Sequence, residues 1–133
     1  MELLIDKRTY NKLINSQQGE LDAIILYKKL AKLVNEENRH TLLGIASDEG
    51  RHASIIKQYT KVNLKPKALK SITVLLIYKI VGLKVTLNML SKGELKASKK
   101  YEALVLQFPK IEEIILDEKR HGEILRNLEN KIK

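Results

Sequence analysis

The chain has 133 residues and a formal net charge of +9, and hydrophobic residues make up 44% of it. It contains no cysteine, which excludes disulfides, zinc ribbons and iron sites made of four cysteines. Few prolines, glycines and aromatic residues indicate long helices in a single all-α domain over residues 1–133. The lysines are scattered, which favours a solvated surface over a nucleic-acid partner. The N-terminus has no basic segment followed by an apolar run, so a cytoplasmic location is expected.

The first predicted helix runs from about Thr9 to Leu33, where apolar residues recur at helical spacing. Glu20 lies in the middle of its apolar stripe, where a carboxylate without a partner would be costly to bury. Either the helix is rotated slightly from this estimate or Glu20 is a ligand, and the spacing leaves both interpretations open. Asn35 then follows in a tight turn as the expected N-cap of the next helix.

The second helix is expected from about Glu36 to Tyr59. Its apolar face carries Glu49, and His52 follows three residues later, about 60° around the helix axis. Side chains at this spacing can bind one metal ion from the same side. A further Glu-x-x-His pair, Glu37 and His40, lies on the opposite face and is interpreted as a surface coincidence.

Residues 60–71 form the one long connection, in which Pro66 forbids an unbroken helix. The most apolar run of the chain follows, from Ile72 to Leu90. Two lysines and an asparagine interrupt this run, and such groups are costly in lipid. The pattern therefore favours a core helix over an integral membrane span.

A straight helix from Ile72 to Glu94 would begin too far from the end of the second helix for twelve connecting residues to reach. Two solutions remain open. Either residues 68–81 form a separate crossing helix with a break near Gly82, or the last two helices are exchanged between two chains. In both cases the apolar run 72–81 must be covered, which favours a homodimer.

The third long helix carries Glu94 and is expected to end near residues 106–107, before a Phe-Pro pair. A fourth helix is expected from about Pro109 to Lys131. Its apolar face carries Glu118, and His121 follows three residues later.

The two halves of the chain repeat one another. In each, a glutamate is followed seven residues later by a tyrosine and then, on the next helix, by Asp-Glu-x-Arg-His. The copies are Glu20, Tyr27 and residues 48–52, and Glu94, Tyr101 and residues 117–121. Each half predicts an antiparallel helix pair, and two stacked pairs give an antiparallel four-helix bundle with a pseudo-twofold axis.

Four carboxylates and two imidazoles would meet inside this bundle, and this set suits two Fe²⁺ or Mn²⁺ ions. The predicted metal ligands are Glu20, Glu49, His52, Glu94, Glu118 and His121. In the usual arrangement Glu49 and Glu118 bridge the two ions, and each histidine shares one ion with a remaining glutamate. Asp48 and Asp117 are the candidates to accept a hydrogen bond from the histidine of the opposite helix and to fix its tautomer.

Two further residues are candidates for a catalytic role. Tyr27 and Tyr101 either hydrogen-bond the bridging carboxylates or are core aromatic residues with a hydrated hydroxyl. Without metal, four buried carboxylates would repel one another, so the metals are expected to contribute folding stability as well as chemistry.

These residues resemble the ferritin-like superfamily, within it the rubrerythrin branch, and in particular the ferritin-like domain that precedes vacuolar-iron-transporter-type membrane domains. The resemblance covers nearly the whole chain. It rests on Tyr27-Lys-Lys-Leu-Ala31, Glu36-Glu37-Asn38, Asp48-Glu49-x-x-His52, Lys65-Pro66, Gly82-Leu83, Lys92-Gly93-Glu94 and Asp117-Glu118-x-x-His121. It implies a ferritin-like four-helix di-iron bundle with ferroxidase or peroxidase-like chemistry. Two departures stand out: Ser91 replaces a second glutamate of the rubrerythrin pattern, and Gly122 replaces a frequent glutamate.

The favoured function is a rubrerythrin-like oxidoreductase that oxidises Fe²⁺ or reduces peroxide or O₂. Without cysteine there is no rubredoxin centre, so the electron donor, or a protein that delivers iron, would be a separate partner. One alternative is a non-catalytic iron carrier or sensor that passes metal to a partner such as a transporter. Another is a basic helical adaptor for nucleic acid or acidic lipid, whose binding would weaken steeply with salt.

Overall fold

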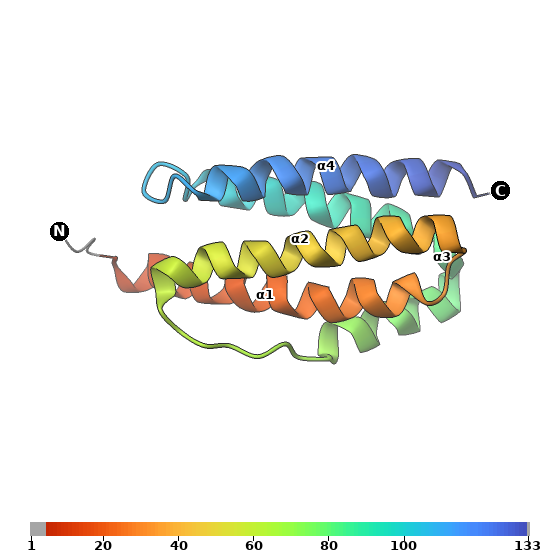
Figure 1. Ribbon diagram of the computed structural model, residues 1–133, viewed down its shortest axis with the longest axis horizontal. Helices are drawn as coiled ribbons and strands as arrows, with labels where there is room; N and C mark the ends of the chain where they lie inside the picture. Colours follow the sequence, from red (N-terminus) through yellow and green to blue (C-terminus); the bar gives the residue numbers. More distant parts are fainter. Residues whose placement is uncertain (1–4, 133) are drawn as a thin grey trace.

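In a computed structural model that describes residues 5–132, the chain forms four α-helices, and no strand occurs in this range (Figure 1). The helices are α1 (Lys7–Ala31), α2 (Glu36–Thr60), α3 (Leu69–Glu102) and α4 (Ile111–Asn130). The predicted all-α class and the four-helix bundle are confirmed.

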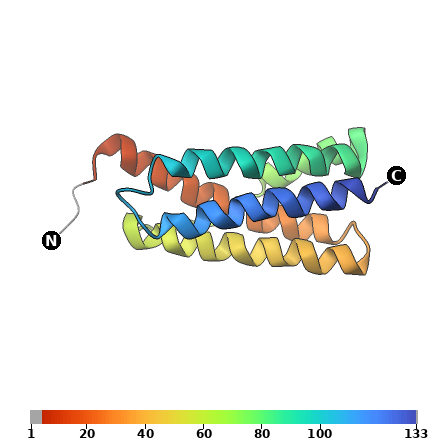
Figure 2. The ribbon, with the colours of Figure 1, turned by 90° about the horizontal axis from the view of Figure 1, so that it is seen from above.

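The helices associate as two pairs, each formed within one half of the chain. α1 packs along α2, and α3 packs along α4, while contacts between the two pairs are less extensive. Figures 1 and 2 show that the two helices of each pair run in opposite directions. The two pairs contact each other through α1 with α3 and, less extensively, through α2 with α4.

Side-chain hydrogen bonds cap the N-termini of α1 and α2. The carboxylate of Asp6 accepts a hydrogen bond of 2.8 Å from the backbone N–H of Thr9 and caps α1. The side chain of Asn35 accepts one of 2.9 Å from Asn38 and caps α2, as the sequence predicts. The acidic residues that follow Asn35 in the first turn of α2 are favourable at the positive end of the helix dipole.

The end of α3 differs from the prediction. The helix stops at Glu102 instead of residues 106–107, and a series of turns follows up to residue 107. These turns bring the side chain of Phe108 into the core, where it is fully buried and its ring centroid lies 4.7 Å from that of Tyr59. Burial of a large aromatic side chain outweighs the continuation of a helix by one more turn.

The predicted break at Gly82 is present. Gly82 has φ 86° and ψ 175°, a conformation essentially restricted to glycine. The chain reverses direction here, so that segment 69–81 runs to one end of the bundle and segment 83–102 returns along it (Figures 1 and 2). Of the two solutions open from the sequence, the structure has the separate helix with the break near Gly82.

The connection between α2 and α3 lies along α1 and is held there by side chains of α1. Three hydrogen bonds join them: Gln17 Nε2 to Val62 O at 2.9 Å, Gln18 Nε2 to Lys65 O at 2.8 Å, and Lys67 N to Asp22 Oδ1 at 2.7 Å. The last two anchors flank Glu20, so segment 69–81 begins close to the middle of α1.

Helix α3 is the one helix of the described chain that is long and apolar enough to cross a membrane by these two criteria. The reversal at Gly82 falls inside its most apolar run, so neither segment offers the roughly 20 continuous apolar residues of a span. Segment 69–81 nevertheless exposes apolar side chains, among them Leu69, Ile72, Leu76 and Ile80. The homodimer that would cover them remains a prediction.

Candidate metal centre

A layer of charged side chains crosses the middle of the bundle, between two clusters of buried apolar residues. One cluster includes Leu26, Leu42 and Leu125, and the other includes Leu13 and Ile114. The six predicted ligands lie between them and are each at most 6% exposed: Glu20, Glu49, His52, Glu94, Glu118 and His121. Four carboxylates at this depth need compensating charge or protons.

The potential ligand atoms form two overlapping groups, and within each group they all lie within 4.8 Å of one another. The first group is Glu20, Glu49, His52 and Glu118, and the second is Glu49, Glu94, Glu118 and His121. Glu49 and Glu118 belong to both. Each group has the composition and compactness to hold a metal ion, with two carboxylates shared between the ions.

The two histidines point the same nitrogen toward the centre. Nδ1 of His52 lies 3.1 Å from Glu118 Oε1 and 3.4 Å from both Glu20 Oε2 and Glu49 Oε1. Nδ1 of His121 lies 3.3 Å from Glu49 Oε1 and 3.7 Å from Glu118 Oε1. The ring centroids are 5.9 Å apart. Both imidazoles therefore converge on the shared carboxylates.

The outer nitrogen of each histidine meets an aspartate of the opposite helix. His52 Nε2 on α2 lies 2.8 Å from Asp117 Oδ2 on α4, and His121 Nε2 on α4 lies 2.8 Å from Asp48 Oδ2 on α2. When the neutral imidazole keeps its proton on Nε2 and donates a hydrogen bond to the carboxylate, Nδ1 carries a free lone pair that faces the centre. The aspartates thus select the tautomer that a metal ligand needs.

Two arginines, for which the sequence predicted no role, contact the aspartates behind the histidines. Arg51 forms an ion pair with Asp117, and Arg120 Nη2 lies 2.8 Å from Asp48 Oδ2 and 3.1 Å from Asp117 Oδ1. Burial opposes ionisation, yet hydrogen bonds from His52, Arg120 and Arg51 lower the pKa of Asp117 to about 2. The available signal was the arginine before the histidine in both copies of the motif.

The two tyrosines bond carboxylates other than the expected ones. The hydroxyl of Tyr27 donates to Glu94 Oε1 at 2.6 Å, and that of Tyr101 donates to Glu20 Oε1 at 2.8 Å. The expectation that they bond Glu49 or Glu118 is therefore wrong. Each tyrosine lies seven residues, about two helical turns, after the glutamate of its own helix, so both side chains lie on the same face of that helix. From this face the hydroxyl reaches the glutamate of the facing helix in the α1–α3 contact.

The inward atoms lack hydrogen-bond partners. Within the described chain the buried atoms without a partner are Glu20 Oε2, Glu49 Oε1, Glu118 Oε1, His52 Nδ1 and His121 Nδ1. Their mutual contacts are short but lack hydrogen-bond geometry. Buried polar atoms in proteins nearly always have a hydrogen-bond partner, so five unpaired atoms that face one space indicate a site suited to cations. A pair of divalent cations fits this donor set of oxygens and imidazole nitrogens.

Burial and neighbouring charges shift the pKa values of the glutamates in this cluster in opposite directions. Burial, with Glu49 nearby, raises the pKa of Glu20 to about 7, and burial with several neighbouring carboxylates raises that of Glu118 to about 12. Against the effect of burial, His121 and His52 lower the pKa of Glu49 to about 2. Despite burial, the surrounding carboxylates raise the pKa of His52, and they raise that of His121 to about 10. The cation-free site therefore holds extra protons on Glu118 and on both imidazoles, and a metal would replace them.

Comparison of the chain with models of protein families, with curated proteins and with solved structures gives no match.

Proposed function

We propose that the chain is a ferritin-like, rubrerythrin-like di-iron carboxylate protein that oxidises Fe²⁺ or reduces peroxide or O₂ at a dinuclear site, with manganese as the alternative metal. The observation that carries this proposal is the sharing of Glu49 and Glu118 between two ligand groups. Four carboxylate charges balance two divalent cations, and oxygen ligands with one imidazole each suit Fe²⁺ or Mn²⁺. The resemblance in sequence to the rubrerythrin branch points the same way.

Each site residue would have a defined role in metal binding. Glu49 and Glu118 would bridge the ions, Glu20 and His52 would complete one coordination sphere, and Glu94 and His121 would complete the other. Two bound Fe²⁺ ions would supply the two electrons that reduction of one peroxide molecule to water requires. Tyr27 and Tyr101 would orient the two terminal carboxylates by their hydrogen bonds.

The first test is the metal content of protein purified without chelator, with a spectrum that reports the oxidation state. We expect about two iron or manganese ions per chain. Anaerobic addition of Fe²⁺, then of peroxide, should give saturable oxidation over repeated cycles. Glu49→Ala should abolish both binding and turnover. Glu37→Ala is the matched control, because Glu37 also has a histidine three residues later, but both side chains are exposed.

The outcomes separate the alternatives. Stoichiometric binding of exchangeable metal without turnover would replace the oxidoreductase by the iron carrier or sensor. Metal-independent binding to nucleic acid or acidic lipid that weakens steeply with salt would favour the adaptor. Equal metal content in Glu49→Ala and in Glu37→Ala would refute the dinuclear site itself.

A further inference from the structure

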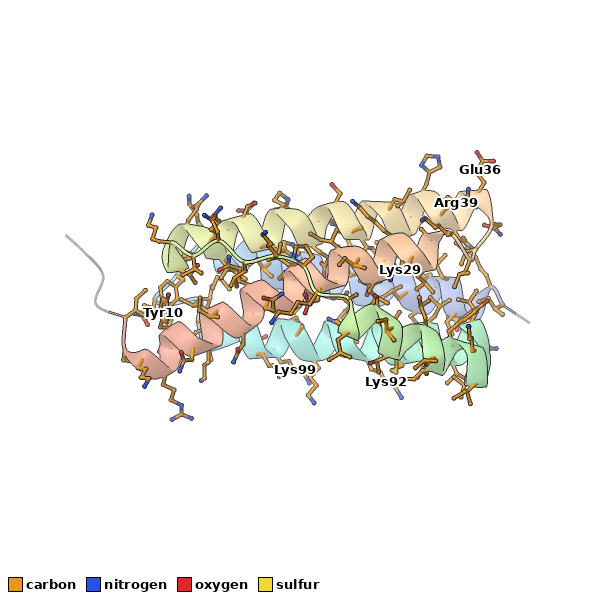
Figure 3. The ribbon with its side chains drawn as sticks, turned by 90° about the horizontal axis from the view of Figure 1, so that it is seen from below. Tyr10, Lys29, Glu36, Arg39, Lys92 and Lys99 are labelled. Carbon is orange, nitrogen blue, oxygen red and sulfur yellow. The ribbon has the colours of Figure 1, made fainter. Side chains whose placement is uncertain are left out.

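A groove of about 840 Å³ opens between α1 and the returning segment of α3 and leads to the candidate metal centre. Its floor is formed by the carboxylates Glu20, Glu49, Glu94 and Glu118 together with Tyr27 and Tyr101. Figure 3 looks onto this face of the molecule, where segment 69–81 crosses beside α1. The groove is far larger than peroxide or O₂ requires and falls in the range of sites for organic ligands.

The two ends of the groove differ in polarity. Lys12 of α1 and Lys99 and Lys100 of α3 line one end, and Lys99 extends from α3 on the face seen in Figure 3. The other end, beneath segment 69–81, is lined by the apolar side chains of Leu26, Val74, Met89 and Leu90 and by Lys70 of that segment. Apart from the floor glutamates, the charged residues that line the groove in the described chain are all lysines. The lysines at the first end of the groove would attract an anionic group.

Two glycines keep the middle of the groove open. Gly19 directly precedes Glu20, Gly93 directly precedes Glu94, and both line the groove. A Cβ added at either position would meet no atom of the described chain within 4 Å, so packing does not require glycine there. Glycine inside a helix is unfavourable relative to alanine, and here its effect is to leave free space above the two terminal carboxylates.

We propose that this groove binds an elongated organic anion with an apolar chain, of the class of fatty-acid carboxylates. The carboxylate lies among Lys12, Lys99 and Lys100, and the chain extends over the metal centre toward Leu90. The distance along α1 from Lys12 to Leu26 is about 21 Å, which suits a chain of this kind. This inference deepens the proposed function by naming the class of molecule that reaches the metal centre. It rests on the proposed function only for the presence of metal beneath the groove.

The test uses decanoate as the probe and the full chain loaded with Mn²⁺, with binding measured by calorimetry. Acetate has the charge without the chain, and 1-decanol has the chain without the charge. We expect decanoate to bind at least about tenfold more tightly than either comparator. Binding of the three probes with equal affinity would overturn the proposal.

Two substitutions locate the probe. Gly93→Phe fills the groove and should weaken decanoate binding about tenfold. Gly44→Phe is its control, since Gly44 is exposed on α2, lies outside the groove and is also free of close neighbours. Lys99→Gln combined with Lys100→Gln should weaken decanoate binding and leave 1-decanol unaffected, whereas Lys96→Gln, outside the groove, should change neither.

The same samples separate the groove from the metal centre. If metal content is zero but decanoate still binds and Gly93→Phe removes that binding, the groove stands and the dinuclear function fails. If Mn²⁺ is bound but Gly93→Phe and Gly44→Phe bind decanoate equally, the metal centre stands and the groove proposal fails.

Discussion

Tyr27 of the first half donates a hydrogen bond of 2.6 Å to Glu94 of the second half, and Tyr101 returns one of 2.8 Å to Glu20. Both bonds cross the contact between α1 and α3, which is less extensive than the contacts within the helix pairs. They are also buried, where a hydrogen bond to a carboxylate is strong. The two tyrosines thus join the halves of the bundle at the height of the ligands and fix one terminal carboxylate each.

Removal of either tyrosine hydroxyl should therefore loosen one terminal ligand. We expect Tyr27→Phe and Tyr101→Phe each to weaken metal affinity about tenfold, and by similar factors, because the two bonds are related by the repeat. Competition with a chelator measures this. Tyr10→Phe is the control, because Tyr10 lies at the start of α1, away from the site (Figure 3). Unchanged affinity in both site variants would show that the tyrosines are only core residues.

The aspartates behind the histidines should tune affinity through the imidazole tautomer. Asp117→Ala removes the acceptor for His52 Nε2 and should lower metal affinity about 10–100-fold. Asp117→Asn keeps an acceptor oxygen, so it should lower metal affinity by a smaller factor. Glu113→Ala is the matched control, because Glu113 also contacts Arg51, at 3.6 Å, but its side chain is 63% exposed. If Asp117→Ala bound metal as tightly as Glu113→Ala, the aspartate would serve only the surface ion pairs.

Metal should stabilise the fold by relieving the buried carboxylates. Saturation with Mn²⁺ at 100 times the dissociation constant should raise the free energy of unfolding by about 2.7 kcal/mol for each ion bound. Glu118→Gln should lose this gain, yet its metal-free form should be at least as stable as metal-free wild type, because burial already favours the neutral acid at this position. Thermal unfolding with and without Mn²⁺ measures both effects. Glu123→Gln, exposed on α4, should respond to Mn²⁺ as wild type does.

The parts of the site that could be predicted depend on local geometry. The placement of Glu49 beside His52, and of Glu118 beside His121, follows from residues three apart on one helix, and the repeat brings the two pairs together. The limited reach of the twelve connecting residues left two possibilities, and the break near Gly82 was one of them. The partners of Tyr27 and the groove depend instead on how the helices rotate and separate, which periodicity does not specify.

Ser91 and Gly122 contact each other between α3 and α4. Ser91 Oγ on α3 donates a buried hydrogen bond of 2.7 Å to the carbonyl oxygen of Gly122 on α4. A Cβ at Gly122 would lie 2.8 Å from side-chain atoms of Leu95 and 3.3 Å from the carbonyl oxygen of Ser91. At these two positions α3 and α4 therefore approach each other closely. The sequence alone gives no sign of this contact, because it depends on the separation of the two helices.

Gly122→Ala should therefore destabilise the protein, by about 1–3 kcal/mol, because the added methyl group overpacks the contact between α3 and α4. Gly44→Ala tests the opposite case in a helix of the same bundle, with no close neighbour. It should be neutral or stabilising by up to about 1 kcal/mol, from helix propensity alone. Urea unfolding measures both variants. A Gly122→Ala protein as stable as Gly44→Ala would mean that Leu95 moves aside without cost.

The reversal at Gly82 should depend on its backbone conformation and not on neighbouring side chains. A Cβ there would meet no atom of the described chain within 4 Å, but φ 86° and ψ 175° are strained for any other residue. Gly82→Ala should therefore lower the free energy of unfolding by about 1–3 kcal/mol in the same urea assay. Metal content should be retained, because Glu94 lies beyond the reversal on segment 83–102. If Gly82→Ala matched Gly44→Ala in stability, the reversal would not be the conformation that the chain adopts, and a continuous α3 would have to be reconsidered.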